Sequence, residues 1–331
     1  MFAFVFPGQG AQRPGMGNLW QDTASWRVVA TLSEATGRDI GALLLHAGAE
    51  ELKVTSNAQL ATFTLSLVIL DAAAAALSAP GLAAGGLVVV PAAVAGHSLG
   101  EYTALVAAGV LSPVAGAQLV AARGSAMADA ATASPGTMAA VLGLDPDGVA
   151  AACAGVDGAW VANDNAPGQI VIAGTSEGVT LASGRARDLG AKRVVALAVG
   201  GAFHTPLMAS AQGALDAALA GAVFSDAAVA CVANVDAAAH TSAGEWRELL
   251  SAQLTSPVRW RQSLGRLSEL GVTTFVELGP GTEMSGMVKR TVGGARRANV
   301  ATPEDLTGLT DLTDLGGLSG LTDLAGLTGA E

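Results

Sequence analysis

The chain has 331 residues, of which 51% are hydrophobic and 14% are charged, and its formal net charge is −11. This length is sufficient for a large buried core in one domain or two. The acidic balance argues against nucleic-acid binding, because proteins that bind phosphate backbones present basic surfaces. No apolar stretch of about 18 residues or more is free of polar, Gly or Pro breaks, so we also expect no membrane span.

The cysteines and the N-terminus indicate where the protein works. Cys153 and Cys231 are far apart and lack a C-x-x-C spacing, which is typical of buried free thiols in a reducing compartment. Residues 1–7 contain no basic segment of a secretory signal and read directly as a strand. We therefore expect a cytoplasmic protein.

The first part of the chain combines a strand with several helices. The segment Phe2–Phe6 predicts a short buried strand that leads into a Gly-rich loop at residues 7–17. Helical patterns follow at residues 19–36, 58–77 and 113–130. This mixture of elements is typical of an α/β domain.

Residues 96–100, Gly-His-Ser-Leu-Gly, fit the G-x-S-x-G nucleophile elbow, a sharp turn between a strand and a helix. The flanks supply that context, because residues 87–95 are apolar and β-branched apart from Pro91, and residues 102–108 begin a helical run. Ser98 would then lie at a helix N-terminus, where free N–H groups stabilise negative charge. A Gly-rich turn with a capping serine is the alternative, since a chain with 43 glycines produces this pattern by chance.

From residue 138 onward the pattern changes to short strands and helices. Strands are expected at residues 138–142, 159–163, 170–173 and 193–197, and helices at residues 147–154 and 177–189. The resulting β-α-β-β-α-β order matches a ferredoxin-like unit. After Pro206 we expect a helix, a strand at residues 229–232, helices at residues 245–254 and 258–270, and a strand at residues 274–278.

We therefore predict an α/β fold in which a large α/β-hydrolase-like subdomain carries an inserted small ferredoxin-like subdomain. The large subdomain comprises residues 1–130 and 199–302, and the small one comprises residues 131–198. Residues 303–331 are a low-complexity tail in which Leu recurs every third residue from Leu306 to Leu327. A period of three drifts around an α-helix, so we expect a mobile, non-catalytic extension, with a partner-binding segment as the alternative.

A serine nucleophile needs a base, and the histidines of the chain are His46, His97, His204 and His240. His97 adjoins the serine and should point away from it, His46 lies on an apolar run, and His240 follows three alanines. His204 lies in a strand-to-helix loop, where α/β folds present catalytic groups. Its position alone leaves two interpretations open, a catalytic base and a structural histidine.

Six motifs follow one another along the chain. They are Phe-Pro-Gly-Gln-Gly-Ala-Gln at residues 6–12, Gly-His-Ser-Leu-Gly-Glu at 96–101, Arg-Gly-Ser-Ala-Met at 123–127, Asn-Asp-Asn-Ala-Pro-Gly-Gln at 163–169, Ala-Phe-His at 202–204 and Gln-Leu-Thr-Ser-Pro-Val at 253–258. In this order they resemble the malonyl-CoA:acyl carrier protein transacylase family of fatty-acid and polyketide synthesis. The resemblance extends from residue 2 to residue 289, and the tail after residue 301 lies outside it.

The resemblance implies catalytic roles for several residues. Ser98 would be the acylated nucleophile and His204 its base, with the second imidazole nitrogen held by a backbone carbonyl near Gln253 and not by a carboxylate. The backbone N–H groups of Gln9 and Leu99 would form the oxyanion hole.

The glycines at residues 8 and 10 would let the first loop approach the elbow closely. A phosphate-cradling loop is the competing interpretation of residues 8–17. The Lys-Ser/Thr pair and the spacing of a P-loop are absent from this segment, so we rank that interpretation lower.

Arg123 would select the substrate, because a planar guanidinium can hold both oxygens of a malonyl carboxylate. An isolated Arg would more simply be a surface residue in a salt bridge. Phe203 would close the space beside the malonyl C2 and disfavour a methyl branch, although many stand-alone family members carry Pro where this chain has Ala202, which leaves the choice of extender open. The rest of the expected substrate-binding set is Met127, Gln253 and Asn163.

The resemblance therefore implies an S-malonyltransferase. It would move a malonyl group from malonyl-CoA to the phosphopantetheine thiol of acyl carrier protein through a serine acyl-enzyme, with no metal or bound cofactor. We expect a monomer without nucleic-acid or membrane partners. Two alternatives are a serine acyl hydrolase of the editing or esterase type and a non-catalytic protein that docks on a synthase. Arg123 argues against the hydrolase, and an intact set of Ser98, His204 and Arg123 argues against the docking protein.

Overall fold

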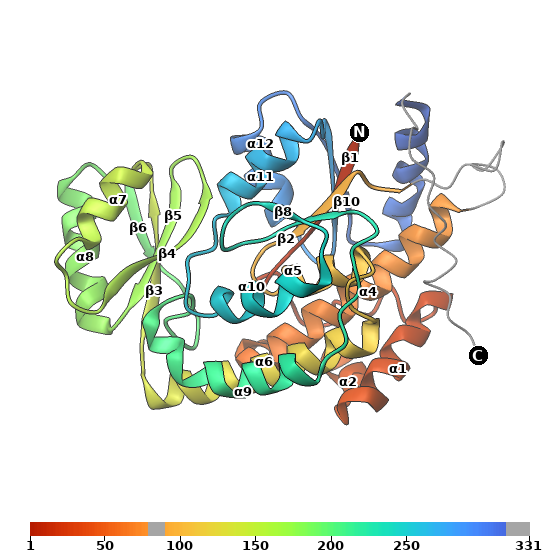
Figure 1. Cartoon of the computed structure of the whole chain (residues 1–331), viewed down its shortest axis with the longest axis horizontal. Coiled ribbons are helices and arrows are strands. Elements are labelled where there is room, and N and C mark those ends of the chain that lie inside the picture. The colour runs from red at the N-terminus through yellow and green to blue at the C-terminus, as the bar shows by residue number, and fades with distance from the viewer. Residues whose placement is uncertain (79–89, 316–331) are drawn as a thin grey trace.

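Two β-sheets and the helices around them make up a mixed α/β structure (Figure 1). The computed structural model describes residues 1–78 and 90–315. Its strands are β1 (Phe2–Phe6), β2 (Ala93–Gly96), β3 (Thr137–Leu142), β4 (Ala159–Ala166), β5 (Gln169–Gly174), β6 (Arg193–Ala196), β7 (Ala230–Val232), β8 (Ala239–His240), β9 (Thr274–Leu278) and β10 (Arg296–Val300).

Helices connect and cover these strands. The α-helices are α1 (Arg27–Thr36), α2 (Ile40–Leu45), α3 (Ala49–Lys53), α4 (Thr55–Leu77), α5 (Gly100–Ala107), α6 (Pro113–Ala133), α7 (Pro146–Cys153), α8 (Ser176–Asp188), α9 (Ala209–Gly221), α10 (Trp246–Gln253), α11 (Trp260–Glu269) and α12 (Glu283–Thr291). The 3₁₀ helices are η1 (Ala24–Trp26), η2 (Pro206–Met208), η3 (Ala243–Glu245) and η4 (Pro303–Leu315).

The larger sheet brings together strands from both ends of the chain. Its order is β10-β9-β1-β2-β7-β8, and every pair from β10 to β7 is parallel, whereas β8 is antiparallel to β7. Both faces are covered, as parallel sheets require: Phe4 and Phe6 belong to the main core, and Val5 belongs to a second core with residues of α11 and α12. Because β1 and β2 are neighbours, their carboxyl ends bring the first loop and the Ser98 elbow to the same edge.

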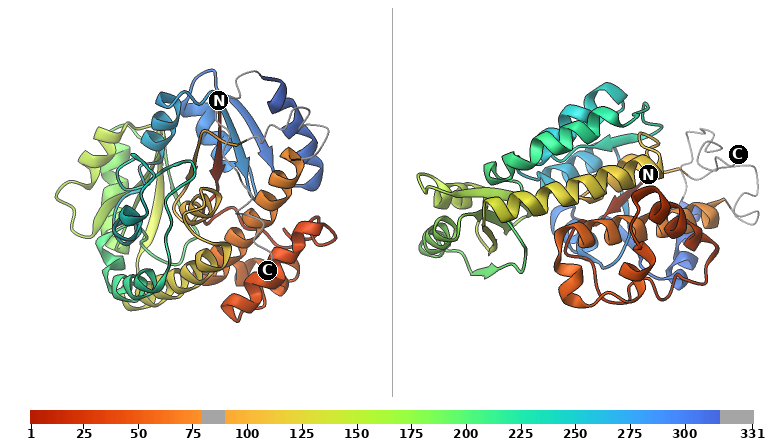
Figure 2. Two further views of the ribbon diagram at one scale, coloured as in Figure 1. Left: turned by 45° about the vertical axis from the view of Figure 1, so that its right-hand side comes forward. Right: turned by 90° about the horizontal axis from the view of Figure 1, so that it is seen from below.

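The smaller sheet is antiparallel throughout, with the order β4-β5-β3-β6. Helices α7 and α8 cover one of its faces, where Val149 and Val179 lie in a separate small core. Met138 and Val171 belong to the main core instead, so the other face turns toward the larger sheet. Figures 1 and 2 show this smaller body at one end of the molecule and η4 at the other.

Strand β4 joins the smaller body to the larger one. The carboxylate of Asp164 accepts hydrogen bonds from Nε and Nη2 of Arg261 on α11, at 2.8 to 3.0 Å. The N–H of Asp164 donates to the carbonyl of Val258 at 2.9 Å, and the N–H of Val258 donates to the carbonyl of Ala162 at 2.9 Å. The pairing of β4 with β5 shifts register on both sides of Asp164, and such bulges re-aim neighbouring side chains.

The residues at the start of helix α6 specify where the helix begins. Ser112 Oγ accepts the N–H of Ala115 at 3.1 Å, and Pro113 occupies the first helical position, where a missing N–H costs nothing. The helix packs against α4 and α9. Arg123 therefore lies between packed helices and is only 1% exposed.

Helix α4 is long and apolar enough, in its 23 residues, to cross a membrane by length and composition. It contains polar residues such as Gln59, Ser66 and Asp71, which are breaks of the kind expected from the sequence. In addition, 72% of its most apolar window is buried inside the protein. A helix that is apolar on all sides and surrounded by other helices is also what the centre of a packed domain contains.

Some predicted boundaries differ from those observed. The helix expected at residues 19–36 starts only at η1, because residues 19–23 form turns and the Trp20 indole donates to the carbonyl of Ala301 at 3.0 Å. Residues 87–89 of the expected apolar approach lie outside the described residues, and β2 occupies Ala93–Gly96. The sequence patterns do not predict α2, α3, α12, β8, β10 or η4. Strand β10 begins with two exposed arginines at the edge of the sheet, which hides its strand pattern.

The prediction that the leucine-rich tail lacks a packed stripe is wrong for its first part. Residues 303–315 form η4, which packs against α4 and β10. A 3₁₀ helix has three residues per turn, so a leucine at every third position stays on one side. Leu309 is 1% exposed and belongs to the main core, and Leu306 packs against it. Residues 316–331 of the tail lie outside the described residues.

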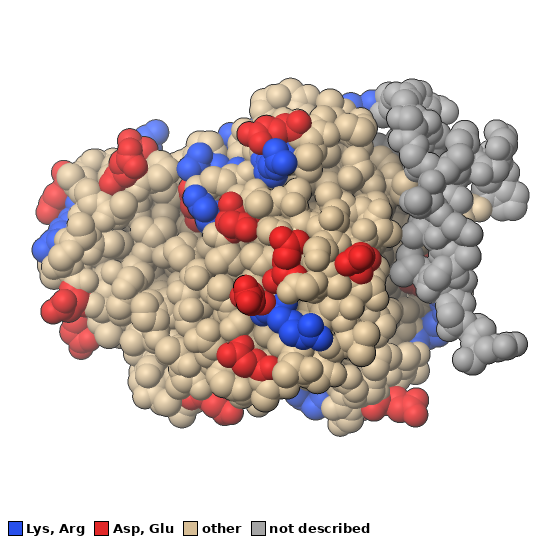
Figure 3. Space-filling model, in the orientation of Figure 1, with Lys and Arg blue, Asp and Glu red and all other residues tan. Residues whose placement is uncertain are grey.

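Charged side chains are sparse on the face shown in Figure 3, as the composition requires. Basic and acidic groups are interspersed over α11 and α12, and most of the surface is uncharged. This face therefore presents no continuous basic stripe of the kind that tracks a phosphate backbone.

We predict that Leu309→Ala lowers the free energy of unfolding by about 2–4 kcal/mol, because it leaves a cavity in the core between η4 and α4. Leu306→Ala is the matched control, since Leu306 is only half-buried, and its effect should be smaller. Urea unfolding measures both. Equal and negligible losses for the two variants would show that η4 does not contribute to the core.

Candidate active site

Ser98 lies on a strained turn between β2 and α5. Its φ angle is 53°, in the left-handed region that a residue other than glycine adopts only when its surroundings hold it there. Both glycines of the motif are sterically required: a Cβ on Gly96 would overlap the carbonyl of Gly100, and a Cβ on Gly100 would overlap the carbonyl of Phe6. The backbone can therefore fold back only with glycine at these two positions, and the turn presents the serine hydroxyl as predicted for a nucleophile elbow.

His204 is placed as a base for this serine. Its Nε2 lies 2.7 Å from Ser98 Oγ, and its Nδ1 lies 2.9 Å from the backbone carbonyl of Gln253. The carbonyl can only accept, so Nδ1 carries the proton and Nε2 is free to accept the serine proton. No carboxylate contacts His204 among the described residues.

Burial sets the protonation state of this histidine. Desolvation, followed by the positive charge of Arg123, lowers the pKa of His204 to about 3, although the hydrogen bond to Gln253 opposes the shift. The imidazole is therefore neutral near neutral pH, which is the form that accepts a proton. The φ angle of His204 is 60°, so this residue too is held in the left-handed region.

Arg123 is the charged group nearest to the nucleophile. Its Nη2 donates to Ser98 Oγ at 3.1 Å and to Oε1 of Gln253 at 2.9 Å, and its Nη1 donates to Oε1 of Gln59 at 2.7 Å. The guanidinium also lies over the ring of Tyr102, 5.5 Å from its centre. Arg123 forms no ion pair with any described residue, and its Nε has no partner. A buried cation whose hydrogen-bond partners are neutral groups is suited to bind an anion.

A cavity of about 390 Å³ lies between the two bodies and opens onto these groups. Apart from Ser98, His204 and Arg123, the predicted site residues that line it are Gln9, Met127, Asn163 and Phe203. Gln253 is buried behind Arg123, and Leu99 is buried at the elbow. The structure thus brings all nine predicted residues into one region.

The expected oxyanion-hole groups are available. The described contacts give the backbone N–H of Gln9 and that of Leu99 no protein acceptor. A Cβ on Gly8 would lie 2.5 Å from the carbonyl of His97, so glycine at residue 8 does allow the close approach of the first loop to the elbow. Gly10 is required for a different reason than the one expected, because it has open space around it but a φ angle of 114°.

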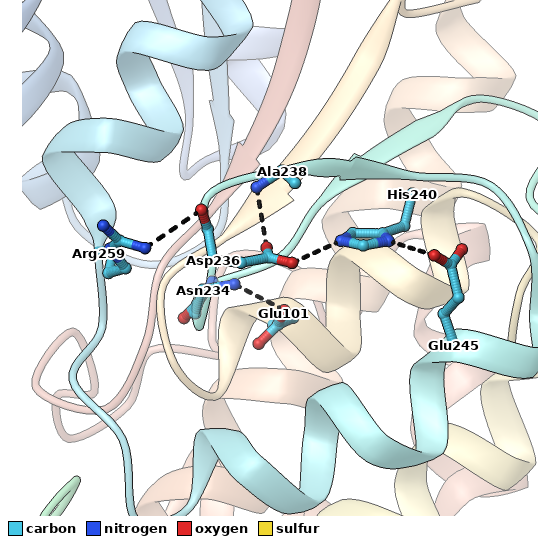
Figure 4. Close-up of polar contacts among 7 residues, drawn as sticks. All are labelled: Glu101, Asn234, Asp236, Ala238, His240, Glu245 and Arg259. Atoms are coloured by element: carbon cyan, nitrogen blue, oxygen red, sulfur yellow. Dashed lines mark hydrogen bonds and ion pairs between the residues drawn. The ribbon is translucent and has the colours of Figure 1, made fainter.

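Asn234, which the sequence did not single out, holds the elbow from beneath. Its Oδ1 accepts the N–H of Ser98 at 2.6 Å, and its Nδ2 donates to the carbonyl of Gly96 at 2.7 Å. Its own N–H donates to the buried carboxyl of Glu101 at 3.0 Å (Figure 4). Gln59 was not among the residues predicted from the sequence either. A glutamine near the start of an apolar helix could have indicated a polar role. No local pattern marks Asn234.

The other histidines have separate roles. The His97 ring contacts Asn165 Oδ1 at 2.7 Å and packs edge-on against Trp260, in agreement with its expected orientation away from Ser98. His240 lies between Asp236 and Glu245, at 2.9 and 3.0 Å (Figure 4). His46 is exposed at the end of α2. Within the part of the chain that the structure describes, no cluster of three or more His, Cys, Asp or Glu could hold a metal ion.

We predict that Gly8→Ala lowers kcat/KM for acylation of Ser98 by at least roughly tenfold, since the new methyl group must displace the loop that carries Gln9. Gly48→Ala is the matched control, because a Cβ at Gly48 meets nothing within 4 Å. Stopped-flow acylation and thermal melting of both variants make the comparison. Full activity in Gly8→Ala would show that the loop position does not matter for acylation.

Comparisons with known proteins identify the family of this chain. The family model for the acyl transferase domain matches residues 3–330, so the match includes the tail that the motifs had placed outside it. The malonyl CoA-acyl carrier protein transacylase of Bacillus subtilis (strain 168) is 41% identical over 310 residues, which cover 92% of this chain and 94% of that protein. The crystal structure of the acyl-carrier-protein S-malonyltransferase from Burkholderia pseudomallei 1710b is 39% identical with a TM-score of 0.85, over 94% of this chain and 99% of that one.

A structure of a type II PKS acyl-carrier protein in complex with its malonyl-transacylase is also similar, with 35% identity and a TM-score of 0.86 over 94% of this chain and 99% of that chain. The family model and the first of these relatives each cover more than nine-tenths of the chain. The chain therefore belongs to the acyl transferase domain family, among the malonyl CoA-acyl carrier protein transacylases.

Proposed function

We propose that this protein is a malonyl-CoA:acyl carrier protein S-malonyltransferase that works through a malonyl ester of Ser98. One observation carries the proposal: a buried guanidinium without a carboxylate partner lies 3.1 Å from a serine hydroxyl that a neutral histidine contacts. The serine and histidine supply acyl transfer, and the guanidinium supplies a place for the free carboxylate of a malonyl group.

The first half-reaction forms the acyl-enzyme. His204 Nε2 takes the proton of Ser98 as the serine oxygen attacks the thioester carbonyl of malonyl-CoA. The resulting oxyanion accepts hydrogen bonds from the N–H groups of Gln9 and Leu99. When the tetrahedral intermediate collapses, the C–S bond breaks and the CoA sulfur takes the proton from His204.

The second half-reaction reverses these steps with a different thiol. The phosphopantetheine thiol of the carrier protein gives its proton to His204 and attacks the malonyl ester, and the serine oxygen leaves with that proton. Because Nδ1 is fixed on the carbonyl of Gln253, the same imidazole nitrogen serves as base and then as acid in both halves.

Arg123 orients the malonyl group in this scheme. The carboxylate would replace Ser98 Oγ as a partner of the guanidinium while Gln59 and Gln253 continue to hold it in place. Phe203 and Met127 border the same cavity, and Asn163 borders it from β4. We propose that Phe203 limits the space beside the malonyl C2 and so disfavours a methyl branch.

We further infer that the two bodies correspond to known architectures. The β-α-β-β-α-β order and the sheet order β4-β5-β3-β6 support a ferredoxin-like insertion at residues 131–198. The parallel sheet with its serine elbow supports an α/β-hydrolase-like body formed by residues 1–130 and 199–302.

We also propose that the protein is a cytoplasmic monomer. It needs no bound cofactor, because the chain itself supplies every protein group in the scheme. Its substrate is malonyl-CoA and its partner is a phosphopantetheinylated acyl carrier protein. The transacylase complexed with a type II PKS carrier protein and the transacylase of Bacillus subtilis both support this chemistry on a carrier protein, in fatty-acid or polyketide synthesis.

The direct test uses malonyl-CoA and a holo carrier protein in sequence. Intact-protein and peptide mass spectrometry should show one malonyl group on Ser98, and added carrier protein should remove it and gain the same mass. Ser98→Ala should remain unlabelled. Labelling followed by release of free malonate instead of transfer would indicate an acyl hydrolase, and no labelling would contradict the proposal.

We predict that Arg123→Ala lowers malonyl transfer far more than acetyl transfer. Loss of a charge-assisted, desolvated contact should cost about 3 kcal/mol, or roughly a hundredfold in kcat/KM for malonyl-CoA. Acetyl-CoA has no carboxylate, so its rate in the same variant serves as the internal control and should hold or rise. An equal loss for both substrates, with the fold intact, would mean that Arg123 supports the site without recognising the substrate.

A further inference from the structure

Glu101 is a buried carboxyl directly beneath the nucleophile that the proposed mechanism does not use. It is the second residue of α5, three positions after Ser98, and its side chain is 0% exposed. A carboxyl in such a place has a desolvation cost, which hydrogen bonds and a nearby positive charge can offset.

Both oxygens of Glu101 accept hydrogen bonds from groups that build the site. Oε1 accepts the N–H of Asn234 at 3.0 Å (Figure 4), and Oε2 accepts Nε2 of Gln253. These two donors are the hydrogen-bond partners of the carboxyl among the described residues. An ionised carboxylate, which accepts at both oxygens, therefore matches this environment.

The contact with Gln253 fixes which way its side-chain amide points. With Nε2 held by Glu101 and by the carbonyl of Ser98 at 2.9 Å, Oε1 is the atom that faces Arg123. If the amide turned over, an NH₂ group would face the guanidinium, donor against donor. Glu101 thus sets the position of Arg123 through Gln253, whose backbone also holds His204.

The contact with Asn234 serves the nucleophile in the same way. Asn234 holds the N–H of Ser98 and the carbonyl of Gly96, and Glu101 holds the backbone of Asn234. Figure 4 shows that the loop after Asn234 is held in turn by Asp236, which contacts His240. One carboxyl therefore connects the serine turn, the base and the anion-binding Arg.

We propose that Glu101 is a positioning residue for malonyl transfer, and that its ionised carboxylate holds Gln253 and Asn234 in the arrangement that the reaction needs. This inference rests on the proposed function and extends it, because it assigns an expected loss of activity at acidic pH to Glu101 instead of the catalytic histidine.

The surroundings of Glu101 place its titration in an accessible range. Burial raises the pKa of Glu101 to about 7, against the opposing hydrogen bonds of Asn234 and Gln253 and the positive charge of Arg123 on α6. The other titratable groups that face it are Asp236 after β7, Cys231 on β7 and Tyr102 on α5. Below this pH the carboxyl gains a proton and becomes a poor acceptor for its two donors, so activity should fall as the pH falls.

Stability should change in the opposite direction. The folded-state pKa of Glu101 is raised above the ordinary value of 4.5, so the contribution of this group to stability is present below that value and is lost as the pH rises through about 7. If activity falls at lower pH while stability does not decrease, the loss of activity cannot result from unfolding. This difference separates a positioning role from a merely structural one.

The experiment measures the rate of Ser98 malonylation against pH in the full-length protein and in Glu101→Gln. The variant copies the neutral state, since an amide nitrogen cannot accept a hydrogen bond. We expect its rate to be at least roughly tenfold below that of the wild type on the alkaline side. We also expect the rate of the variant to show no fall near pH 7, unlike that of the wild type. At alkaline pH the melting temperature of the variant should be no lower than that of the wild type.

Glu277→Gln is the matched control. Glu277 is also 0% exposed, its pKa is also raised by burial, and it accepts the N–H groups of Met284 and Ser285 at 3.1 and 2.8 Å. It makes no contact with Gln253, Asn234 or Ser98 among the described residues, so the midpoint of the pH profile should stay in place. The inference would be overturned if the malonylation rate of Glu101→Gln fell with decreasing pH as it does in the wild type. It would also be overturned if Glu277→Gln lacked this fall.

If Glu101→Gln does not fold, the temperature dependence of the wild-type pH profile provides the test. The pKa of a carboxyl barely changes with temperature, whereas the pKa of a histidine falls as the temperature rises. A midpoint of the pH profile that falls on warming would therefore overturn the inference. Failure of the proposed function is recognised separately, because the wild type would then form no malonyl ester at any pH or would not pass it to the carrier protein.

Discussion

Burial of the Arg123 guanidinium without a carboxylate partner is the interaction on which the rest of the site depends. Gln59, Gln253 and the serine hydroxyl accept the hydrogen bonds of this cation, and the charge of Glu101 nearby also favours it. These acceptors must themselves be held, and the carboxyl of Glu101 beneath the elbow does so through Gln253. The polar groups around the nucleophile thus form one connected network inside an apolar fold, in which the displacement of one member is transmitted to the others.

The same positive charge affects the base. Burial and the neighbouring guanidinium both keep His204 neutral, so it is ready to take a proton without first losing one. The carboxylate of a bound malonyl group would offset part of this charge and make the imidazolium easier to form during the reaction. The residue proposed to select the substrate would then also adjust the base that acts on it.

Local patterns in the sequence identified much of this arrangement. The strand–turn–helix around Ser98, the short strands and helices between residues 138 and 197 and the family motifs led to the larger part of the fold and to nine site residues. Asn234 could not be found in this way, because its role depends on β7 lying next to β2, a pairing between residues far apart in the chain. Strand β10 and η4 were missed because edge-strand charges and a period of three hide the patterns that were sought.

The 3₁₀ geometry of η4 has a consequence for how this part of the gene can change. Leucine occupies every third position from Leu306 onward, and the helix repeats after the same number of residues. Insertion or deletion of one whole three-residue unit therefore returns a leucine to the side that packs on α4. Slippage of the DNA polymerase by nine nucleotides would shorten or lengthen the helix without turning it, whereas a change of one or two codons would rotate the leucines away from the core. Length variation in multiples of three residues is the kind that this end of the protein can accept.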